Sequence, residues 1–309
     1  MSGSIYYIRN YQSLDFNKYV KLCAEAEKME PSGRCVSPQF VAEQLERPNY
    51  SPEQDLFIAG IDEIIIGYMN VTPELTIGRV VLSCWVHPEH RRKGLATKFL
   101  GYATNRAGEL GARIAHVNVE EDNVVAERLL SGLGFSFVRR FLELRLDIAD
   151  IGRLDINPVA TGCRYLQPGE EDKLTQLQNC AFAGTWGYSP NTVEEITFRT
   201  RLSNCSLDDI MLIHEGDKAI GHCWTGTSCE AGVPSARVGR ILMLGVDPDY
   251  RGKGVGKKLI LGGIAHLESK GLQVAELTVD SENKVACTLY KSLGFKVQAS
   301  TLWYGKTLN

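Results

Sequence analysis

Apolar and polar positions alternate along the chain in segments of strand and helix length. Short apolar runs bounded by glycine, proline or charged residues predict β-strands at 5–10, 56–60, 64–69, 80–86, 114–119 and 135–146. Apolar residues at helical spacing predict helices at 14–29, 38–46, about 95–110 and 124–133. Strands that alternate with helices in this way are typical of an α/β fold.

The same pattern begins again after a segment at 147–160 that contains Gly152 and Pro158 and is predicted to be a linker. Strands are predicted at 163–167, 211–214, 219–224 and 240–246, with helices at 172–182 and 257–270. Twelve identities recur at a constant offset of 160 residues, without a gap: Val86/Val246, Pro88/Pro248, Arg91/Arg251, Lys93/Lys253, Gly94/Gly254, Gly111/Gly271, Val119/Val279, Asn123/Asn283, Ala126/Ala286, Leu129/Leu289, Gly134/Gly294 and Phe135/Phe295. The sequence therefore predicts two copies of one α/β domain, at 1–150 and 161–309.

A glycine-rich segment, 246–256, links the strand at 240–246 to the helix at 257–270. Free backbone N–H groups and the positive end of a helix dipole at such a turn suit a phosphate or pyrophosphate. The phosphate loop of ATPases would need glycine at 251 and serine or threonine at 258, and the dinucleotide fingerprint would need glycine at 257. The chain has arginine and two lysines at these positions, so neither motif applies.

Two blocks of residues carry a family resemblance in each copy. The pattern Arg-x-x-Gly-x-Gly, at Arg251, Gly254 and Gly256, resembles the acetyl-CoA-binding signature of the GNAT acetyltransferase superfamily. The pattern Val-x-x-x-Asn-x-x-Ala-x-x-Leu-x-x-x-x-Gly-Phe, which ends at Phe295, resembles the family's second block. The chain thus resembles a tandem GNAT protein over essentially its whole length. This resemblance implies α+β domains whose mixed sheet splays between its fourth and fifth strands, with acetyl-CoA in the cleft.

The resemblance also implies which residues bind acetyl-CoA. In the second copy these are Leu244, Val246, Arg251, Gly252, Lys253, Gly254, Val255, Gly256, Lys257 and Asn283. In the first copy they are Val86, Arg91, Arg92, Lys93, Gly94, Leu95 and Ala96. Gly245 either marks a β-bulge in its strand or relieves packing there.

Family members transfer the acetyl group directly to an amine. The resemblance gives the backbone N–H of Leu244 the role of oxyanion donor and Tyr290 the role of the acid that protonates the departing thiolate. The alternative for Tyr290 is an aromatic side chain that fills the core. Leu130 stands at the matching position of the first copy and cannot donate a proton. We therefore expect a catalytic second domain and a non-catalytic first domain, which either holds acetyl-CoA structurally or has a remodelled cleft.

The general base is not evident. Arg240 occupies the position at which many family members carry a glutamate, and Val80 does so in the first copy. Arginine stays protonated and cannot act as a base. Glu276 is our candidate, and the alternatives are Asp280, Glu230 and an ordered water.

Two aromatic residues, Trp186 and Tyr188, lie in a loop where family members build the acceptor pocket. They are candidates for contact with the acceptor. The alternative is a loop that Trp186 anchors on the core. His222 and Trp224 alternate on a predicted strand and are expected in the core or between the domains; the alternative is that they face the acceptor pocket.

Composition narrows the class of protein. A length of 309 residues, 44% hydrophobic and 23% charged, is typical of a globular protein, and a net charge of −3 gives no support to nucleic-acid or anionic-membrane binding. The nine cysteines lack disulfide or zinc spacing, and no metal site is predicted, with His87 and His90 expected at the surface or in ordinary packing. No signal peptide or membrane span is evident in the sequence, so a cytoplasmic protein, monomer or homodimer, is expected.

We therefore expect an enzyme that moves the acetyl group of acetyl-CoA to a primary amine of a small molecule. The second enzymatic alternative is acetylation of a protein N-terminus or lysine side chain. An alternative from another class is a non-catalytic protein that binds or senses acetyl-CoA.

Overall fold

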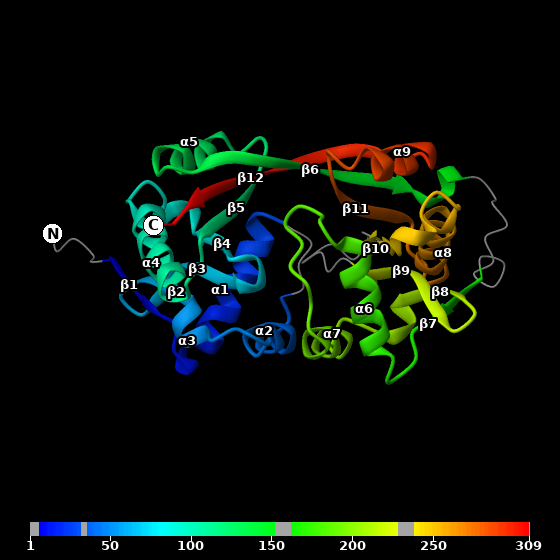
Figure 1. Cartoon of the computed structure of the whole chain (residues 1–309). Coiled ribbons are helices and arrows are strands. Elements are labelled where there is room, and N and C mark those ends of the chain that lie inside the picture. Colours follow the sequence, from blue (N-terminus) through cyan, green and yellow to red (C-terminus); the bar gives the residue numbers. More distant parts are fainter. Residues whose placement is uncertain (1–5, 32–35, 152–161, 228–237, 309) are drawn as a thin grey trace. The chain divides into compact units, whose positions relative to one another are not determined.

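The computed structural model describes residues 6–31, 36–151, 162–227 and 238–308 (Figure 1). These residues form two compact units. Of the described residues, unit 1 contains those up to 140 together with 301–308, and unit 2 contains those from 141 to 300.

Unit 1 is a mixed sheet with helices on both faces. Its strand order is β1-β2-β3-β4-β5-β12, and the neighbours are antiparallel except for β4 and β5, which are parallel. The strands are β1 (Tyr6–Asn10), β2 (Leu56–Ile61), β3 (Ile64–Glu74), β4 (Arg79–Val86), β5 (Ile114–Glu120) and the second half of β12 (Lys296–Thr307). The helices of its described residues are α1 (Phe16–Met29), α2 (Pro38–Leu45), α3 (Pro52–Asp55), α4 (Leu95–Glu109) and α5 (Val124–Gly132).

Unit 2 repeats this arrangement. Its strand order is β7-β8-β9-β10-β11-β6, and β10 and β11 form the parallel pair. The strands are β7 (Cys163–Tyr165), β8 (Ile210–Glu215), β9 (Lys218–Thr227), β10 (Val238–Val246), β11 (Val274–Asp280) and the second half of β6 (Ser136–Asp147). The helices of its described residues are α6 (Glu171–Phe182), α7 (Val193–Thr200), α8 (Val255–Ser269) and α9 (Lys284–Ser292). The predicted mixed α/β fold is confirmed.

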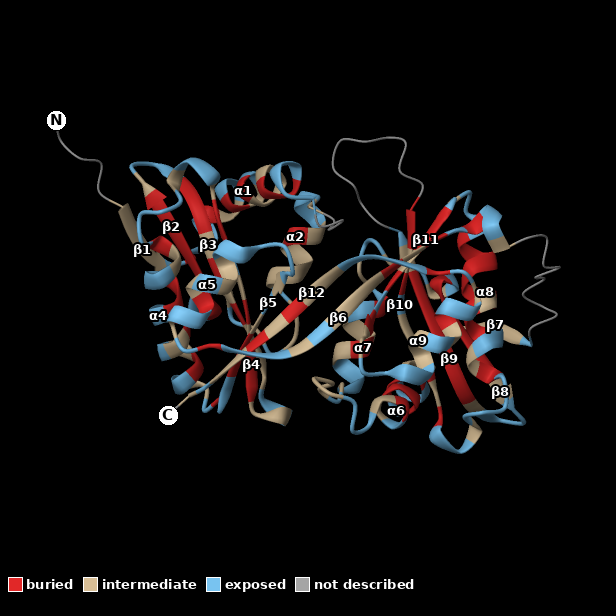
Figure 2. Ribbon diagram, turned by 90° about the horizontal axis from the view of Figure 1, so that it is seen from above, coloured by how far each residue is buried: buried red, intermediate tan, exposed pale blue. Residues whose placement is uncertain are grey.

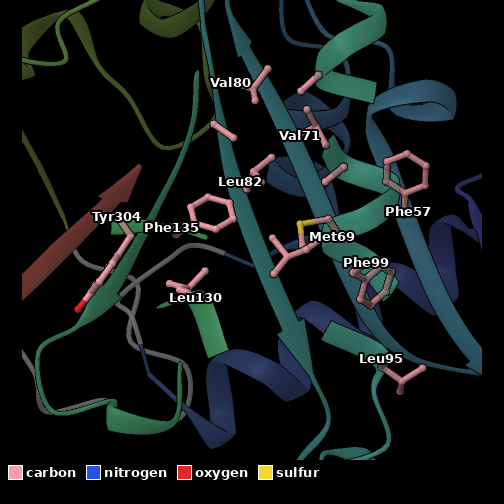
Figure 3. Close-up of a cluster of buried hydrophobic side chains, with 14 of the residues drawn as sticks. Phe57, Met69, Val71, Val80, Leu82, Leu95, Phe99, Leu130, Phe135 and Tyr304 are labelled. Carbon is pink, nitrogen blue, oxygen red and sulfur yellow. The ribbon is translucent and has the colours of Figure 1, made fainter. Parts of the chain in front are cut away.

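Each sheet separates two apolar clusters. In unit 1, side chains of β3 and β4 meet α4 and α5 on one face, and Phe99 lies fully buried among them (Figure 3). On the other face, Tyr19 and Leu22 of α1 pack against Ile58 of β2. In unit 2, α8 and α9 cover one face and α6 and α7 cover the other. Buried positions accordingly follow the strands and the inner faces of the helices (Figure 2).

The last strand of each sheet comes from the opposite half of the sequence. Residues 301–307 of β12 pair antiparallel with β5 of unit 1, and Leu302 and Tyr304 enter its core. Residues 141–147 of β6 pair antiparallel with β11 of unit 2, and Leu144 and Leu146 enter that core. The compact units therefore differ from the contiguous ranges 1–150 and 161–309 that the repeat suggests. Hydrophobic pattern identifies strands but not the sheet edge that each one joins.

Candidate functional site

The parallel strands β10 and β11 are paired over only part of their length. Their register runs from Val238 opposite Val274 to Ile241 opposite Leu277 and ends there. In unit 1, β4 and β5 pair over the equivalent four positions, up to Leu82 opposite Val117. Beyond Ile241, the backbone N–H and C=O groups on the β11 side of β10 do not pair with β11. Leu244 and Val246, the predicted partners of acetyl-CoA on this strand, lie in that diverging part.

A β-bulge does occur in β10, but not at Gly245. The register with β9 shifts between Ile241 and Met243, which leaves Leu242 bulged and 54% exposed. Gly245 is paired normally, opposite His222. A Cβ atom at residue 245 would collide with Cε1 of His222 and lie 3.0 Å from its Nδ1. Of the two interpretations of this glycine, relief of packing is therefore correct.

The glycine-rich loop of unit 2 has the geometry of an anion cradle. Gly252 and Gly254 adopt left-handed conformations, with φ of 74° and 81°, and a Cβ at either position would meet nothing within 4 Å. Gly254 is the N-cap of α8 and provides no side-chain hydrogen bond to it. No side chain at the N-cap therefore occupies the first N–H groups of α8. These groups can donate to a bound pyrophosphate. These residues fit the pyrophosphate of acetyl-CoA.

Arg251 holds this loop in place through hydrogen bonds to backbone carbonyl groups. Its Nε donates to the carbonyl oxygen of Val246 at 3.3 Å, and its Nη2 donates to that of Ala181, at the end of α6, at 2.7 Å. The ammonium of Lys253 lies 4.8 Å from the ring centroid of Tyr250. Of Arg251 and Lys253, the exposed Lys253 is therefore the one available to an incoming anion, while Arg251 fixes the loop to the strand and to α6.

The first copy of the loop keeps the same backbone path. Arg92 and Gly94 have φ of 63° and 77°, which matches Gly252 and Gly254. Arg91 donates to the carbonyl oxygen of Val86 at 2.8 Å, as Arg251 does to Val246, and also to Glu30 at 2.6 Å. Lys93 donates to the hydroxyl of Tyr6 at 2.8 Å. The loop conformation is thus retained even where a residue other than glycine must adopt a left-handed φ.

This strain leads to a stability prediction. Because a side chain in the left-handed region costs about 1 kcal/mol, Arg92→Gly should stabilise unit 1 by roughly that amount. Native-state hydrogen exchange of the β4 amides would measure the change. Lys93→Gly is the matched control, since Lys93 has a negative φ and glycine there should give no gain. Equal effects of the two substitutions would contradict the explanation.

Tyr290 lies in the core of unit 2, on α9. It is 7% exposed and its ring centroid is 5.8 Å from that of Phe295. Burial raises its pKa well above the usual value for tyrosine, and the neighbouring thiol of Cys223 acts in the same direction. Cys223 is also the register partner of Leu244 on β10. The predicted acid and the predicted oxyanion donor therefore share Cys223 as a neighbour.

Asn283, predicted to contact acetyl-CoA, caps α9 with its side chain. Its Oδ1 accepts from the backbone N–H of Ala286 at 3.1 Å, and Asn123 caps α5 in the same way. The asparagine of the second block therefore sets the start of the helix that carries Tyr290. Val255 and Leu95 begin α8 and α4 and are buried. Gly256, Lys257 and Ala96 continue these first turns.

Unit 1 differs from unit 2 at the positions that the sequence predicts to act in transfer. Leu130 is buried in the core at the place of Tyr290. Trp85 stands at the place of Gly245, opposite Tyr68, and its indole N–H donates to Glu30 at 2.8 Å. At this position unit 1 therefore has a bulky indole where unit 2 has a glycine, over which the ring of His222 lies.

Glu276, our candidate base, is an ion-pair residue. It lies opposite Arg240 in the register of β10 and β11. One carboxylate oxygen is 3.0 Å from Nη1 of Arg145 and the other is 3.7 Å from Nε of Arg240. The carboxylate of Glu276 therefore already forms ion pairs with two guanidinium groups. Asp280 accepts from the N–H of Glu282 at 2.9 Å, and Glu230 lies outside the described residues.

The predicted acceptor loop is anchored by both of its aromatic residues. The ring centroid of Trp186 is 5.9 Å from that of Phe141. Tyr188 stacks on Phe182 at 5.1 Å, and its hydroxyl donates to Asn179 at 2.9 Å. The sequence analysis did not predict the helix that follows, α7. Thr192 and Glu195 form a capping box at its start, and their spacing is a signal of a helix N-terminus.

His87 and His90 lie close together beside the first copy of the loop. Donor atoms of His87, Glu89 and His90 are within 4.8 Å of one another. However, Nδ1 of His87 accepts from the N–H of Glu89 at 3.3 Å, as the carboxylate of Asp247 does from Asp249 at 3.0 Å in unit 2. His87 therefore acts as the cap of this turn.

Comparison with known sequences places both copies in one family. The model of the Acetyltransferase (GNAT) family matches residues 21–135 and 172–295. A mycothiol acetyltransferase of Actinosynnema mirum is 29% identical over 284 residues, covering 89% of this chain and 90% of that protein. A mycothiol acetyltransferase of Thermobispora bispora is 31% identical over 217 residues, covering 68% and 70%.

Solved structures agree on the fold. A GCN5-related N-acetyltransferase from Sphaerobacter thermophilus superposes with a TM-score of 0.70 at 21% identity, covering 98% of this chain and 96% of that one. A tandem GNAT protein from the clavulanic acid biosynthesis pathway also gives a TM-score of 0.70, at 13% identity and 99% coverage of both chains.

Among the described helices, none combines the length and the apolar character needed to cross a bilayer. With both copies matched by the family model, the chain belongs to the GNAT acetyltransferase family, as a tandem-domain, acetyl-CoA-dependent N-acetyltransferase.

Proposed function

We propose that unit 2 transfers the acetyl group of acetyl-CoA directly to a primary amine of a small molecule, and that unit 1 is not catalytic. The observation that carries this proposal is the neighbourhood of Cys223, which brings together Tyr290 and Leu244. In unit 1 the place of Tyr290 is taken by Leu130, which has no proton to donate.

Each part of unit 2 has a separate task in this proposal. The N–H groups from Gly252 to Gly256 would hold the pyrophosphate, with Lys253 contributing charge. The diverging edge of β10 would pair with the pantetheine arm through Leu244 and Val246. The N–H of Leu244 would donate to the carbonyl oxygen of the thioester, where negative charge develops. Tyr290 is protonated at neutral pH, and its raised pKa extends that range upwards; it would donate its proton to the departing sulfur.

Unit 1 keeps a loop of the same conformation, Arg91 to Gly94, although Trp85 fills the adjacent face of β4. We propose that this loop binds acetyl-CoA without transfer or has lost binding because of that indole. The two outcomes differ in the number of acetyl-CoA molecules that the chain binds.

The acceptor is proposed to be a small-molecule amine. The curated relatives are named as mycothiol acetyltransferases, which supports a small acceptor. Arg240 stands where many family members carry a glutamate, and its ion pair with Glu276 gives this part of the site a different charge. For that reason we propose only the class of acceptor. A protein N-terminus or lysine side chain remains the alternative substrate, and acetyl-CoA sensing the alternative function.

Release of free thiol from acetyl-CoA tests the proposal. The full-length protein should release thiol in the presence of small primary amines, and mass spectrometry should find one acetyl group on the amine for each thiol formed. A peptide with a free N-terminus and a lysine tests the alternative substrate. Saturable acetyl-CoA binding with no thiol release for any amine or peptide would favour sensing and contradict the proposed transfer.

A further inference from the structure

Two polar side chains of unit 2 are fully buried between α6 and β9. His222 is 0% exposed, and neither of its ring nitrogens has a hydrogen-bond partner among the described residues. Gln178 is also 0% exposed, and its Nε2 has no such partner, although its Oε1 accepts from Asn191 at 3.4 Å. Buried polar atoms in folded proteins are almost always hydrogen-bonded, to protein or to ordered water. Three orphaned nitrogens in one interface therefore indicate an additional polar partner.

These nitrogens lie beside the segment of β10 that diverges from β11. His222 is the register partner of Gly245, and its Nδ1 and the Cβ of Ala181 each lie 3.0 Å from where a Cβ of Gly245 would be. The ring centroids of His222 and Phe182 are 6.1 Å apart. Gln178 precedes Ala181 and Phe182 by three and four residues and so shares their face of α6.

A packing role alone does not account for this choice of residues. Phenylalanine and leucine would fill similar space without burying three nitrogens. In unit 1 the register pair at the same place is Tyr68 and Trp85, and the indole N–H there is satisfied by Glu30. The orphaned polar pair thus occurs in the unit that has Tyr290.

The surroundings of His222 keep its imidazole neutral. Burial lowers the pKa of His222 to about 3, and no charged group contributes to that shift. The groups that face it are Ala181 and Phe182 from α6, Gly245 from β10 and its register partner Leu212 from β8, and Gln178 lies on the same face of α6 as Ala181. Next to these residues, the guanidinium of Arg251 donates to the carbonyl of Ala181, and the ring of Tyr188 stacks on Phe182. A neutral imidazole can accept a hydrogen bond from water at one ring nitrogen and donate one to water at the other.

We propose that His222 and Gln178 hold buried water next to Gly245, and that this water receives the proton that the acceptor amine loses during acetyl transfer. This inference rests on the proposed function and makes the two side chains positioning residues. The amine nitrogen forms a bond to the carbonyl carbon of the thioester and the carbon–sulfur bond breaks. Sulfur takes the proton of Tyr290, the proton of the amine passes through the water to solvent, and Tyr290 regains a proton from solvent. Water thus replaces the carboxylate that is absent at Arg240.

Two shape-preserving substitutions test this inference in the full-length protein. His222→Phe and Gln178→Leu remove the orphaned nitrogens, and Leu177→Met on the same helix is the control. Each of the two should lower kcat by about 10-fold or more and change the solvent isotope effect on kcat. The dissociation constant for acetyl-CoA, measured by calorimetry, should stay within about 2-fold of the wild-type value, because acetyl-CoA binds through the loop and β10.

A crystal structure of the wild-type protein provides a readout that does not depend on activity. It should contain an ordered water within hydrogen-bond distance of a ring nitrogen of His222. A dry interface, or variants that melt at higher temperature and keep the wild-type kcat, would overturn the inference, since removing unsatisfied polar atoms from a dry core is stabilising. Failure of the proposed function is recognised separately, because the wild-type protein would then release no thiol with any amine.

Discussion

A fragment of residues 161–309 should fail to fold, whereas a fragment of residues 141–309 should fold cooperatively. The shorter fragment lacks the half of β6 that pairs with β11 along its whole length, from Phe141 opposite Asp280 to Asp147 opposite Val274. It also lacks Leu144, Leu146 and Ile148, which are 5%, 2% and 6% exposed in the core of unit 2.

The size of this effect follows from the buried area. Full burial of a leucine or isoleucine side chain contributes about 1.5–3 kcal/mol, so the three together contribute roughly 5–9 kcal/mol. A typical domain is stable by about 5–15 kcal/mol, and the fragment would also expose the unpaired edge of β11. Urea unfolding followed by circular dichroism compares the two fragments directly. A cooperative transition of 161–309 at the midpoint of 141–309 would show that β6 is dispensable.

The same core can be tested in the intact chain. Leu146→Ala should destabilise unit 2 by about 2–5 kcal/mol, because it leaves a cavity where β6 packs against the rest of the unit. Protection of β11 amides from hydrogen exchange should fall accordingly. Unchanged protection of β11 would mean that residues 141–147 of β6 contribute little to the stability of unit 2.

Tyr290→Phe should lower kcat by about 10²–10⁴-fold and leave acetyl-CoA binding nearly unchanged. The substitution keeps the ring in the core and removes only the hydroxyl that would protonate the departing sulfur. Because the pKa of Tyr290 is raised, the hydroxyl keeps its proton as the pH rises through 10, where an ordinary tyrosine loses half of its protons. The wild-type kcat should therefore show no fall from tyrosine ionisation up to about that pH.

Tyr304→Phe is the matched control for this substitution. Tyr304 is 3% exposed and belongs to the core of unit 1, so loss of its hydroxyl should leave kcat unchanged. Steady-state kinetics of both variants, with folding checked by circular dichroism, separates the roles. If Tyr290→Phe kept the wild-type kcat, the tyrosine would be a core residue, as the alternative interpretation has it.

Local features of the site were predictable from the sequence because they depend on neighbouring residues. The left-handed turns at Gly252 and Gly254 favour glycine, and the side chain of Asn283 caps the start of α9, so these residue types stand at characteristic spacings in the sequence. The constant offset of 160 residues located the matching Gly94 and Asn123 in unit 1, whereas the left-handed turn at Arg92, which no glycine marks, is known only from the structure.

Features that depend on distant partners were not predictable in this way. A strand such as β12 has the same alternation whichever sheet edge it joins, so its pairing with β5 becomes visible only in three dimensions. The bulge at Leu242 reflects the register with β9, and Gly245 is explained only by the ring of His222 across that register. The carboxylate of Glu276 is a plausible base in the sequence, but the structure places it between Arg145 and Arg240.

Calorimetric titration of acetyl-CoA into the full-length protein tests the central claim most directly. Gly94→Trp and Gly254→Trp are matched variants, because both glycines are N-caps with similar φ and open space around a Cβ. Once each variant is shown to be folded, Gly254→Trp should lose the unit 2 binding site together with thiol release, whereas Gly94→Trp should retain both. A folded Gly254→Trp that binds and turns over acetyl-CoA like the wild-type protein would contradict the assignment of catalysis to unit 2.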